Sequence, residues 1–482
     1  MNSRYLWIAS VALVLPILAR AIWFYPGLTI RPKVATPDYQ NMTIPVPPFE
    51  TPPTDEEVSL LGGVVVFDSA HINSFQPSEI EALTEALTQR GARFEFDTDS
   101  GTLVTRLKYA RAYVVISPNT SFSPEEIRAV QTFAARGGRL VVFTDATRGQ
   151  LAYDFFTGGS TYFPDVNTAN PLLSAFDITI NNDYLYNLAE NEGNFRNVFF
   201  DDFGKSELTF GLKRVALYGT HSVRSESGLI LLLGADQTLS SLTDAPAASS
   251  GGAALSADGN VLAFGDFTFL TTPYHGVADN RTLIANLADF ILSGARQPGL
   301  ADFPYIFRSG TVSVLTTSDV QMTSEMIGAL GRLQAALQMV NVKVQVTDEA
   351  PTEGDVLVLG TFIPTEDLLP FIEPFDVVLD DFAEFVELPG FGKIGRFGNG
   401  LLFFEIGPGG NTLVLLADTG MDLTALLDVV SSGSLYGCLI QETTGVCSIG
   451  FGGSFSDEPT PIFTPFETPF GEPTPTPDIP GD

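Results

Sequence analysis

The chain has 482 residues and a formal net charge of −32, a length that suits about two to four domains. A hydrophobic content of 44% supplies large cores and excludes wholesale disorder. The acidic excess argues against nucleic acid as a partner, because phosphate binding needs clustered Lys and Arg side chains. Two cysteines and three histidines exclude a four-cysteine zinc centre, and no ligand pairs have the spacing of a mixed one.

The N-terminus reads as a targeting segment. Arg4 precedes an apolar run from Tyr5 to Ala19, and aromatic residues Trp23 to Tyr25 close the stretch. One interpretation is a cleaved secretory signal with Ala19-Arg20-Ala21 as the cleavage site. The other, which we favour, is an uncleaved anchor over 5–25 whose Arg20 snorkels to the interface. A buried N-terminal helix is the remaining alternative. Both favoured readings predict that the rest of the chain is extracytoplasmic.

Two segments are rich in proline. Residues 32–53 contain seven prolines and residues 458–482 contain eight, a composition that favours an extended stalk and an extended or disordered tail. Cys438 and Cys447 are separated by eight intervening residues and precede that tail. Outside the cytoplasm they predict a disulfide that closes a short loop, and two unpaired buried thiols are the alternative.

Strands and capped helices alternate after the stalk. Apolar runs predict strands at 63–68, 92–97, 113–117 and 139–144, while Ser78 and Ser123 each start a capping box for a helix. The Gly/Ala/Ser-rich segment 243–260 predicts a surface excursion, a buried strand follows at 261–265, and a helix from Asn280 closes the unit near residue 298. This alternation predicts an α/β fold with a doubly wound, mostly parallel sheet.

A second, smaller α/β unit begins at Thr311 and repeats this order of strands and helices in shortened form. We interpret it as a degenerate repeat of the first unit. The alternative is that the similarity is only the one that all βαβ units share. The expected boundaries are an N-terminal targeting segment at 1–27, a Pro-rich linker at 28–57, α/β domains at 58–298 and 305–452, and a Pro/Thr-rich tail at 453–482.

Candidate chemistry is sparse. Asp68, Ser69 and His71 follow the first strand, where doubly wound folds bind ligands, and are the candidate ligand-site residues. Sequence neighbours rarely have triad geometry, and no G-x-S-x-G elbow is present. The paired carboxylates lie outside any EF-hand-like loop. Without a P-loop or a strand-linked G-x-G-x-x-G, nothing supports a nucleotide, so no cofactor or metal is expected.

The order of motifs in the first unit resembles a known group. GGRLVVFTD, the Asn/Tyr-rich insert SAFDITINNDYLYNLAENEGNFRNV and GNVLAFGDFTFLTTPY follow one another, and Gly265-Asp266-Phe267 precedes Asn280, Leu283 and Asn286. Over residues 60–298 the chain resembles bacterial domain-of-unknown-function proteins with a class I glutamine-amidotransferase-like fold. That group is related to auxiliary subunits of gliding-motility-type ABC transporters and to GIFT domains.

The resemblance implies the glutamine-amidotransferase-like fold but not the amidotransferase reaction. Amidotransferases use a cysteine on a strand-to-helix elbow, whereas this chain has no cysteine before Cys438, and Thr144 and Asp145 follow RLVVF. Asp266, Asn280 and Asn286 are therefore predicted to be structural, with Asn280 as the N-cap of the closing helix.

These observations predict a non-enzymatic, membrane-tethered, extracytoplasmic protein. It would bind a protein partner in the cell envelope, as a scaffold or as an auxiliary of an ABC-type transporter. The alternative is a hydrolase or transferase that acts on envelope material from the strand ends with Asp68, Ser69 and His71. A Ca²⁺-dependent adhesin that uses the acidic second unit is a third reading.

Overall fold

A computed structural model describes residues 3–24, 61–153, 158–242, 251–349, 351, 353–380, 383–433, 435 and 437–450. The predicted linker at 28–57 and tail at 453–482 lie outside these residues. The chain divides into a unit formed by residues 1–57 and a unit formed by residues 58–482.

The first unit contains helix α1 (Ser3–Phe24). Within it, Ser3–Trp23 is the one described helix that is long and apolar enough to cross a membrane, with a mean hydropathy of 2.0 and no buried side chains. Such a helix suits either a signal sequence or an anchor. The sequence prediction of an N-terminal apolar segment is confirmed at this level.

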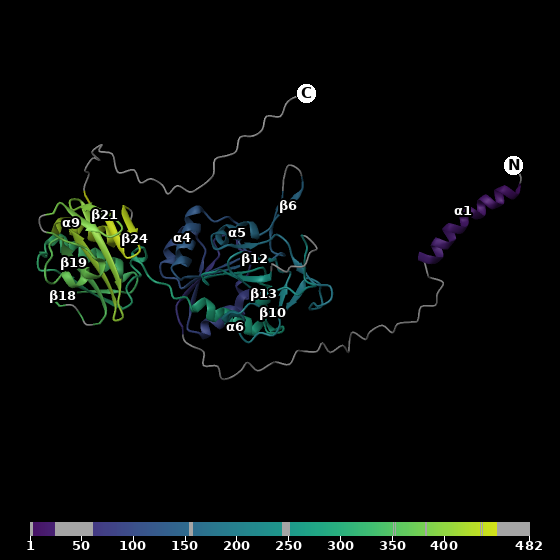
Figure 1. Ribbon diagram of the computed structural model, residues 1–482, viewed down its shortest axis with the longest axis horizontal. Coiled ribbons are helices and arrows are strands. Elements are labelled where there is room, and N and C mark those ends of the chain that lie inside the picture. The colour runs from purple at the N-terminus through teal and green to yellow at the C-terminus, as the bar shows by residue number, and fades with distance from the viewer. Residues whose placement is uncertain are drawn as a thin grey trace, which may run out of the picture. The chain divides into compact units, whose positions relative to one another are not determined.

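The second unit starts with a large mixed sheet (Figure 1). Its five parallel strands, in spatial order, are β2 (Arg93–Asp97), β1 (Val64–Asp68), β3 (Ala112–Ile116), β4 (Arg139–Phe143) and β16 (Val261–Phe264). Three antiparallel strands continue it: β15 (Gly251–Leu255), β13 (Leu229–Leu233) and β10 (Asp202–Phe203). Strand β12 (Val223–Ser225) pairs with β15 and with β7 (Ile178–Ile180). The predicted α/β class with a mostly parallel sheet is confirmed.

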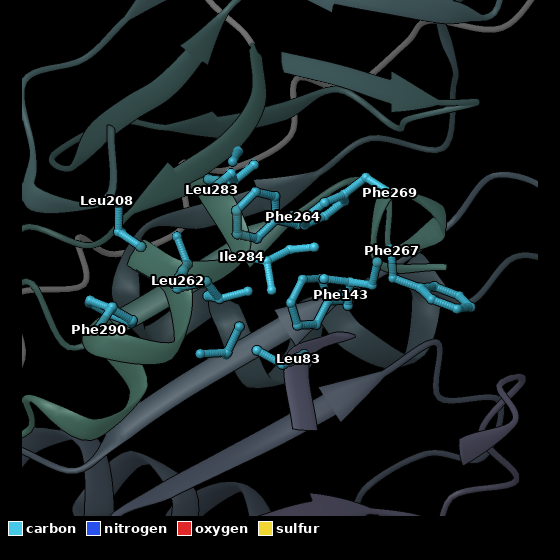
Figure 2. Close-up of a cluster of buried hydrophobic side chains, with 14 of the residues drawn as sticks. Leu83, Phe143, Leu208, Leu262, Phe264, Phe267, Phe269, Leu283, Ile284 and Phe290 are labelled. Carbon is cyan, nitrogen blue, oxygen red and sulfur yellow. The ribbon is translucent and has the colours of Figure 1, made fainter. Parts of the chain in front are cut away.

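Helices cover both faces of this sheet. Val65 and Phe67 pack with helices α2 (Glu81–Gln89) and α6 (Asn280–Leu292). Val64 and Val66 point the other way, toward α3 (Leu103–Leu107), α4 (Pro124–Ala135) and α5 (Val166–Leu173). This alternation has the period of two that a strand requires. Figure 2 shows the α6 side, where Phe143, Phe264 and Leu283 converge.

Three small antiparallel pairs decorate the first sheet. They are β5 (Gln150–Tyr153) with β6 (Ser160–Phe163), β8 (Leu185–Tyr186) with β14 (Leu239–Ser240), and β9 (Asn197–Phe200) with β11 (Val215–Tyr218). Strand β8 lies in the Asn/Tyr-rich insert and β9 begins at its end, while their partners β14 and β11 lie further along the chain. Folding of this insert brings residues near 184 and near 240 side by side.

The structure corrects two local expectations. The helix predicted to be capped by Ser78 is instead capped by Gln76, whose amide donates a hydrogen bond to Glu79, and a 3₁₀ turn, Pro77–Ile80, leads into α2. The segment 251–255, predicted as a surface excursion, is the buried strand β15. At Gly251 a Cβ atom would stand 2.0 Å from the Leu232 carbonyl oxygen, so close strand packing, rather than flexibility, explains the glycine. Ser123 does cap α4 as predicted.

The second sheet has the order β18 (Lys343–Thr347), β17 (Thr311–Thr316), β19 (Asp355–Thr361), β23 (Asn411–Ala417), β22 (Asn399–Ile406), β25 (Thr444–Ser448) and β24 (Cys438–Gln441). Its first four strands are parallel. Helices α7 (Ser324–Gln338) and α9 (Gly420–Ser431) cover one face, while α8 (Leu369–Ile372) and the hairpin of β20 (Phe385–Leu388) and β21 (Gly392–Gly395) cover the other. The order matches that of the first sheet with the α4–β4 step left out.

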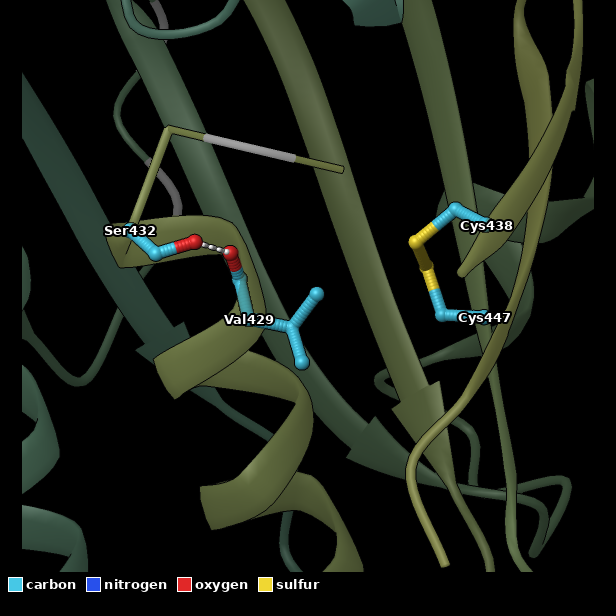
Figure 3. The surroundings of a disulfide bond; sticks show 4 residues. All are labelled: Val429, Ser432, Cys438 and Cys447. Carbon is cyan, nitrogen blue, oxygen red and sulfur yellow. Dashed lines mark hydrogen bonds between the residues drawn. A yellow bond between two sulfur atoms is a disulfide. The ribbon is translucent and has the colours of Figure 1, made fainter. Parts of the chain in front are cut away.

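The last hairpin carries the cysteines. Cys438 on β24 faces Cys447 on β25, and a disulfide joins them (Figure 3). The half-buried Cys438 and the buried Cys447 pack against the core beneath α9. The bond therefore links the edge strand β24 covalently to β25, its one neighbour among the described strands of the second sheet.

Candidate functional site

A row of polar side chains lines the carboxyl edge of the first sheet. Each of the five parallel strands ends in one or leads into one: Asp97, Asp68, Ser117, Asp145 and Asp266. All five are almost completely buried. This is the edge at which open α/β sheets bind ligands, so the side chains there define the candidate site.

The first cluster surrounds His71. Its Nδ1 lies 2.8 Å from Asp68 Oδ1, and its Nε2 lies 3.4 Å from Glu126 Oε1 at the start of α4. The ring stacks on Phe122 with a centroid distance of 3.7 Å. Asn73 donates to the other Asp68 oxygen. Only 3% of His71 is exposed, so this cluster joins the β1 loop to α4 and has almost no contact with solvent.

The pKa of His71 is raised. Burial alone would lower it, but the hydrogen bond that His71 donates to Asp68 and the charges of Asp68 and Glu126 outweigh that cost. The imidazole ring thus lies between two carboxylates. The third predicted candidate, Ser69, is not part of this arrangement. Its amide donates to the Asp97 carbonyl, and no described hydrogen bond joins its hydroxyl to His71.

A second cluster, which the sequence did not reveal, lies beside the first. The Ser117 hydroxyl donates to Asp165 Oδ2 at 2.7 Å, and Asp165 Oδ1 lies 3.5 Å from His221 Nε2. All three side chains are buried. Ser117 has φ +42°, an unusual backbone conformation for a residue other than glycine, and one that marks functional or strained positions. Asp165 and His221 lie 56 residues apart in the sequence, so no local pattern links them.

The geometry fixes where one proton lies. His221 Nδ1 stands 2.6 Å from the Asp183 carbonyl oxygen, which can only accept, so Nδ1 carries a hydrogen. Nε2 then faces the Asp165 carboxylate, and neither facing atom bonds to another described residue. His221 therefore bridges the Asp183 carbonyl and the Asp165 carboxylate inside the core.

Asp145 and Asp266 form the third part of the site. Burial raises the pKa of both carboxyl groups. The charge of Asp165 further raises the pKa of Asp145, and Asp145 further raises the pKa of Asp266. Asp145 accepts from the hydroxyls of Thr147 and Thr268, and Asp266 accepts from the amides of Tyr218 and Thr268. Through these bonds Asp266 holds the loop after β16.

Asn280 has a different role from the predicted N-cap. It is the first residue of α6, after Asp279, and its side chain bonds sideways to strand β11. Oδ1 accepts from the Ala216 amide, and Nδ2 donates to the carbonyls of Ala216 and Tyr274. Asn286, one and a half turns later, donates to the carbonyls of Leu208 and Phe210. Both asparagines tie α6 to the segment 208–216, a long-range contact that short-range capping rules cannot anticipate.

The three parts are filled rather than open. Asp68, Ser117, Asp145, Asp165, His221 and Asp266 are each at most 1% exposed, and their polar atoms mainly bond to one another or to backbone. Among the described residues, no three His, Cys, Asp or Glu side chains are arranged to hold a metal ion. In this conformation the groups organise loops, and a substrate would need to displace them to reach a reactive atom.

The model of a family described as "Domain of unknown function (DUF4350)" matches residues 72–288, in line with the predicted domain-of-unknown-function resemblance. Similar solved structures include "mmIFT52 N-terminal domain", at 12% identity and TM-score 0.37 over 48% of this chain and 99% of that one. A comparison with curated proteins finds no match.

Two thua-like proteins are also similar. One, from Bacteroides uniformis, has 12% identity and TM-score 0.30 over 50% of this chain and 94% of that chain. The other, from Parabacteroides merdae, has 8% identity and TM-score 0.26 over 49% of this chain and 92% of that chain. The fold assignment rests on the sheet order described above.

Proposed function

We propose that this protein is a non-enzymatic, membrane-anchored binding or scaffold protein on the extracytoplasmic side of the membrane. The observation that carries the proposal is the closed carboxyl edge. Its acids, hydroxyl and imidazoles are buried and bond mainly to one another or to backbone, so they stabilise loops and present no reactive atom to solvent. The apolar helix α1 supplies the anchor, and the net charge of −32 favours a soluble, self-repelling exterior.

The partner that we propose is a protein complex of the cell envelope, with an ABC-type transporter as the leading case. This assignment rests on the resemblance of residues 60–298 to transporter auxiliary and GIFT-related proteins. A binding role fits a fold whose site is closed, because function can then reside on the outer surfaces of the insert and of the second sheet.

The test uses the full-length protein, tagged and crosslinked in its native membranes. Recovery of ATPase and permease subunits, unchanged by Asp68→Asn, is the expected result. The same preparation is offered envelope glycans and lipids as substrates. Turnover that disappears in Asp68→Asn, at an unchanged melting temperature, would replace the scaffold proposal with the hydrolase or transferase alternative.

A further inference from the structure

The insert of the first domain carries an aromatic pocket away from the buried clusters. It has a volume of about 220 Å³ and is lined by Tyr184, Tyr186, Leu188, Phe195 and Ser241. The Tyr186 and Phe195 rings meet edge to face with centroids 6.4 Å apart. Leu188 is 75% exposed and Phe195 41%. An apolar surface of this kind costs free energy unless a ligand covers it.

The pocket is held rigidly. The amide of Tyr184 donates to the Ser241 hydroxyl, and the Ser241 amide donates back to the Tyr184 carbonyl. Asn187, buried behind the pocket, accepts from the amides of Ala189 and Glu190 and receives a bond from Asn191 at its carbonyl. A preformed pocket loses little conformational entropy when it binds.

The lining limits the ligand chemistry. Besides the tyrosines, Ser241 is the one polar lining residue, and its hydroxyl is already engaged. A sugar needs several convergent polar groups, which this lining lacks. The guanidinium of Arg196 lies 4.3 Å from the Tyr184 ring centre and 5.5 Å from that of Phe195, and among the described residues no carboxylate pairs with it. The site suits apolar rings next to an acidic group.

The chain itself contains such a ligand. The pentapeptide PFETP occurs twice, at 48–52 and at 465–469. Aromatic-lined grooves are the usual receptors of proline-rich segments. Residues 451–482 carry six acidic and no basic residues, which complements Arg196. We propose that the C-terminal segment 464–470 docks in the aromatic pocket, with its Pro and Phe rings on the tyrosines and Glu467 on Arg196.

Chain length favours the C-terminal copy. Only eight residues separate the N-terminal copy from Leu61, whose amide bonds to Arg90 at the amino end of β1. The pocket adjoins the opposite edge, through Asp183 and its bond from His221. Eight extended residues reach about 25 Å, which is less than the width of a domain whose radius of gyration is about 18 Å. The fourteen residues at 451–464 follow β25 and reach about 45 Å, toward the pocket of the same molecule or of a second copy.

Peptide binding provides the first test. The full chain with Pro465→Ser and Phe466→Ser, which removes the resident motif, is titrated with a fluorescent peptide of residues 464–472. Saturable binding is expected. Phe195→Ser and Arg196→Glu should each raise the Kd by about tenfold or more, as for other central interface residues. The exposed Arg224→Glu, a matched charge reversal on β12, should leave the Kd unchanged. A Glu467→Lys peptide should regain affinity for the Arg196→Glu protein.

The intact chain provides the second test. With benzoylphenylalanine at position 466, photocrosslinks should map to residues 184–196, within one molecule or between two copies. Arg196→Glu should remove them, and circular dichroism confirms that each variant is folded. Crosslinks to any other region, crosslinks only from position 49, or binding of an N-acetylglucosamine tetramer without binding of the peptide would overturn the proposal. None of these outcomes bears on the transporter partner proposed above.

Discussion

At the scale of single residues, the side-chain amide of Asn280 forms hydrogen bonds with backbone groups in the core. Its three hydrogen bonds serve strand β11 and the loop carbonyl of Tyr274 inside the core. Asn280→Ala should lower the free energy of unfolding by about 2–4 kcal/mol, since each buried polar group left unpaired costs about 1–3 kcal/mol. Urea denaturation measures this. The half-buried Asn286→Ala is the control and should lose about 1 kcal/mol or less. Equal losses would contradict the bracing role.

His71 gives the stability a defined pH dependence. Because its pKa is raised from 6.5 in the folded state, the charged form stabilises the fold fully at lower pH, and this contribution is lost as the pH rises through the folded pKa. Unfolding free energies measured across that range should fall, and His71→Gln should flatten the fall. The slope that remains belongs partly to Asp145 and Asp266, whose raised pKa values act in the same direction. If the unfolding free energy of His71→Gln fell with pH at the same slope as that of the unmodified protein, a charged His71 would not contribute to stability.

Strand β15 is the element most sensitive to side-chain volume. Gly251→Ala would push Cβ to within 2.0 Å of the Leu232 oxygen, which forces the central strands apart, and should cost about 3 kcal/mol or more. Gly331, on the exposed face of α7, has no atom within 4 Å of its Cβ position. Gly331→Ala should therefore stabilise the protein by about 0.5–1 kcal/mol. Chemical denaturation of the two variants should give opposite signs; a tolerated Gly251→Ala would mean that β15 is not a central strand.

Element by element, the sequence predicted what local chemistry determines. The Ser123 capping box and the β-branched runs of β1 and β4 need no distant partner to be recognised. The sequence did not predict the Gly/Ala-rich strand β15, because the residues of this segment form a strand only through pairing with β13 and β16 on either side. The candidate site divides in the same way: Asp68 and His71 are three residues apart and were found, whereas Ser117, Asp165 and His221 meet only through the tertiary fold.

For the whole molecule, proteolysis should reveal the layout. Proline-rich composition predicts early cleavage within 28–56 and after about 455, leaving both α/β domains together. The connection between them should resist, because the buried Asp302 bonds to Arg136, Arg296 and the Gly299 amide. Mass spectrometry of a limited trypsin or thermolysin digest identifies the cuts. Resistance throughout 28–56, or first cleavage at 300–310, would contradict this layout.

The disulfide can report which side of the membrane the domains occupy. Cys438 and Cys447 lie opposite each other on an edge hairpin, and such a bond persists in oxidising compartments and is rare in the cytoplasm. In native membranes both thiols should therefore resist alkylation under denaturing, non-reducing conditions. A variant without residues 1–24, retained in the cytoplasm, should take up two alkyl groups, which intact mass measures directly. Because the same hairpin is present in both proteins, a difference can come only from the compartment. Free thiols in the full-length membrane protein would place the domains in the cytoplasm and remove the basis for an extracytoplasmic role.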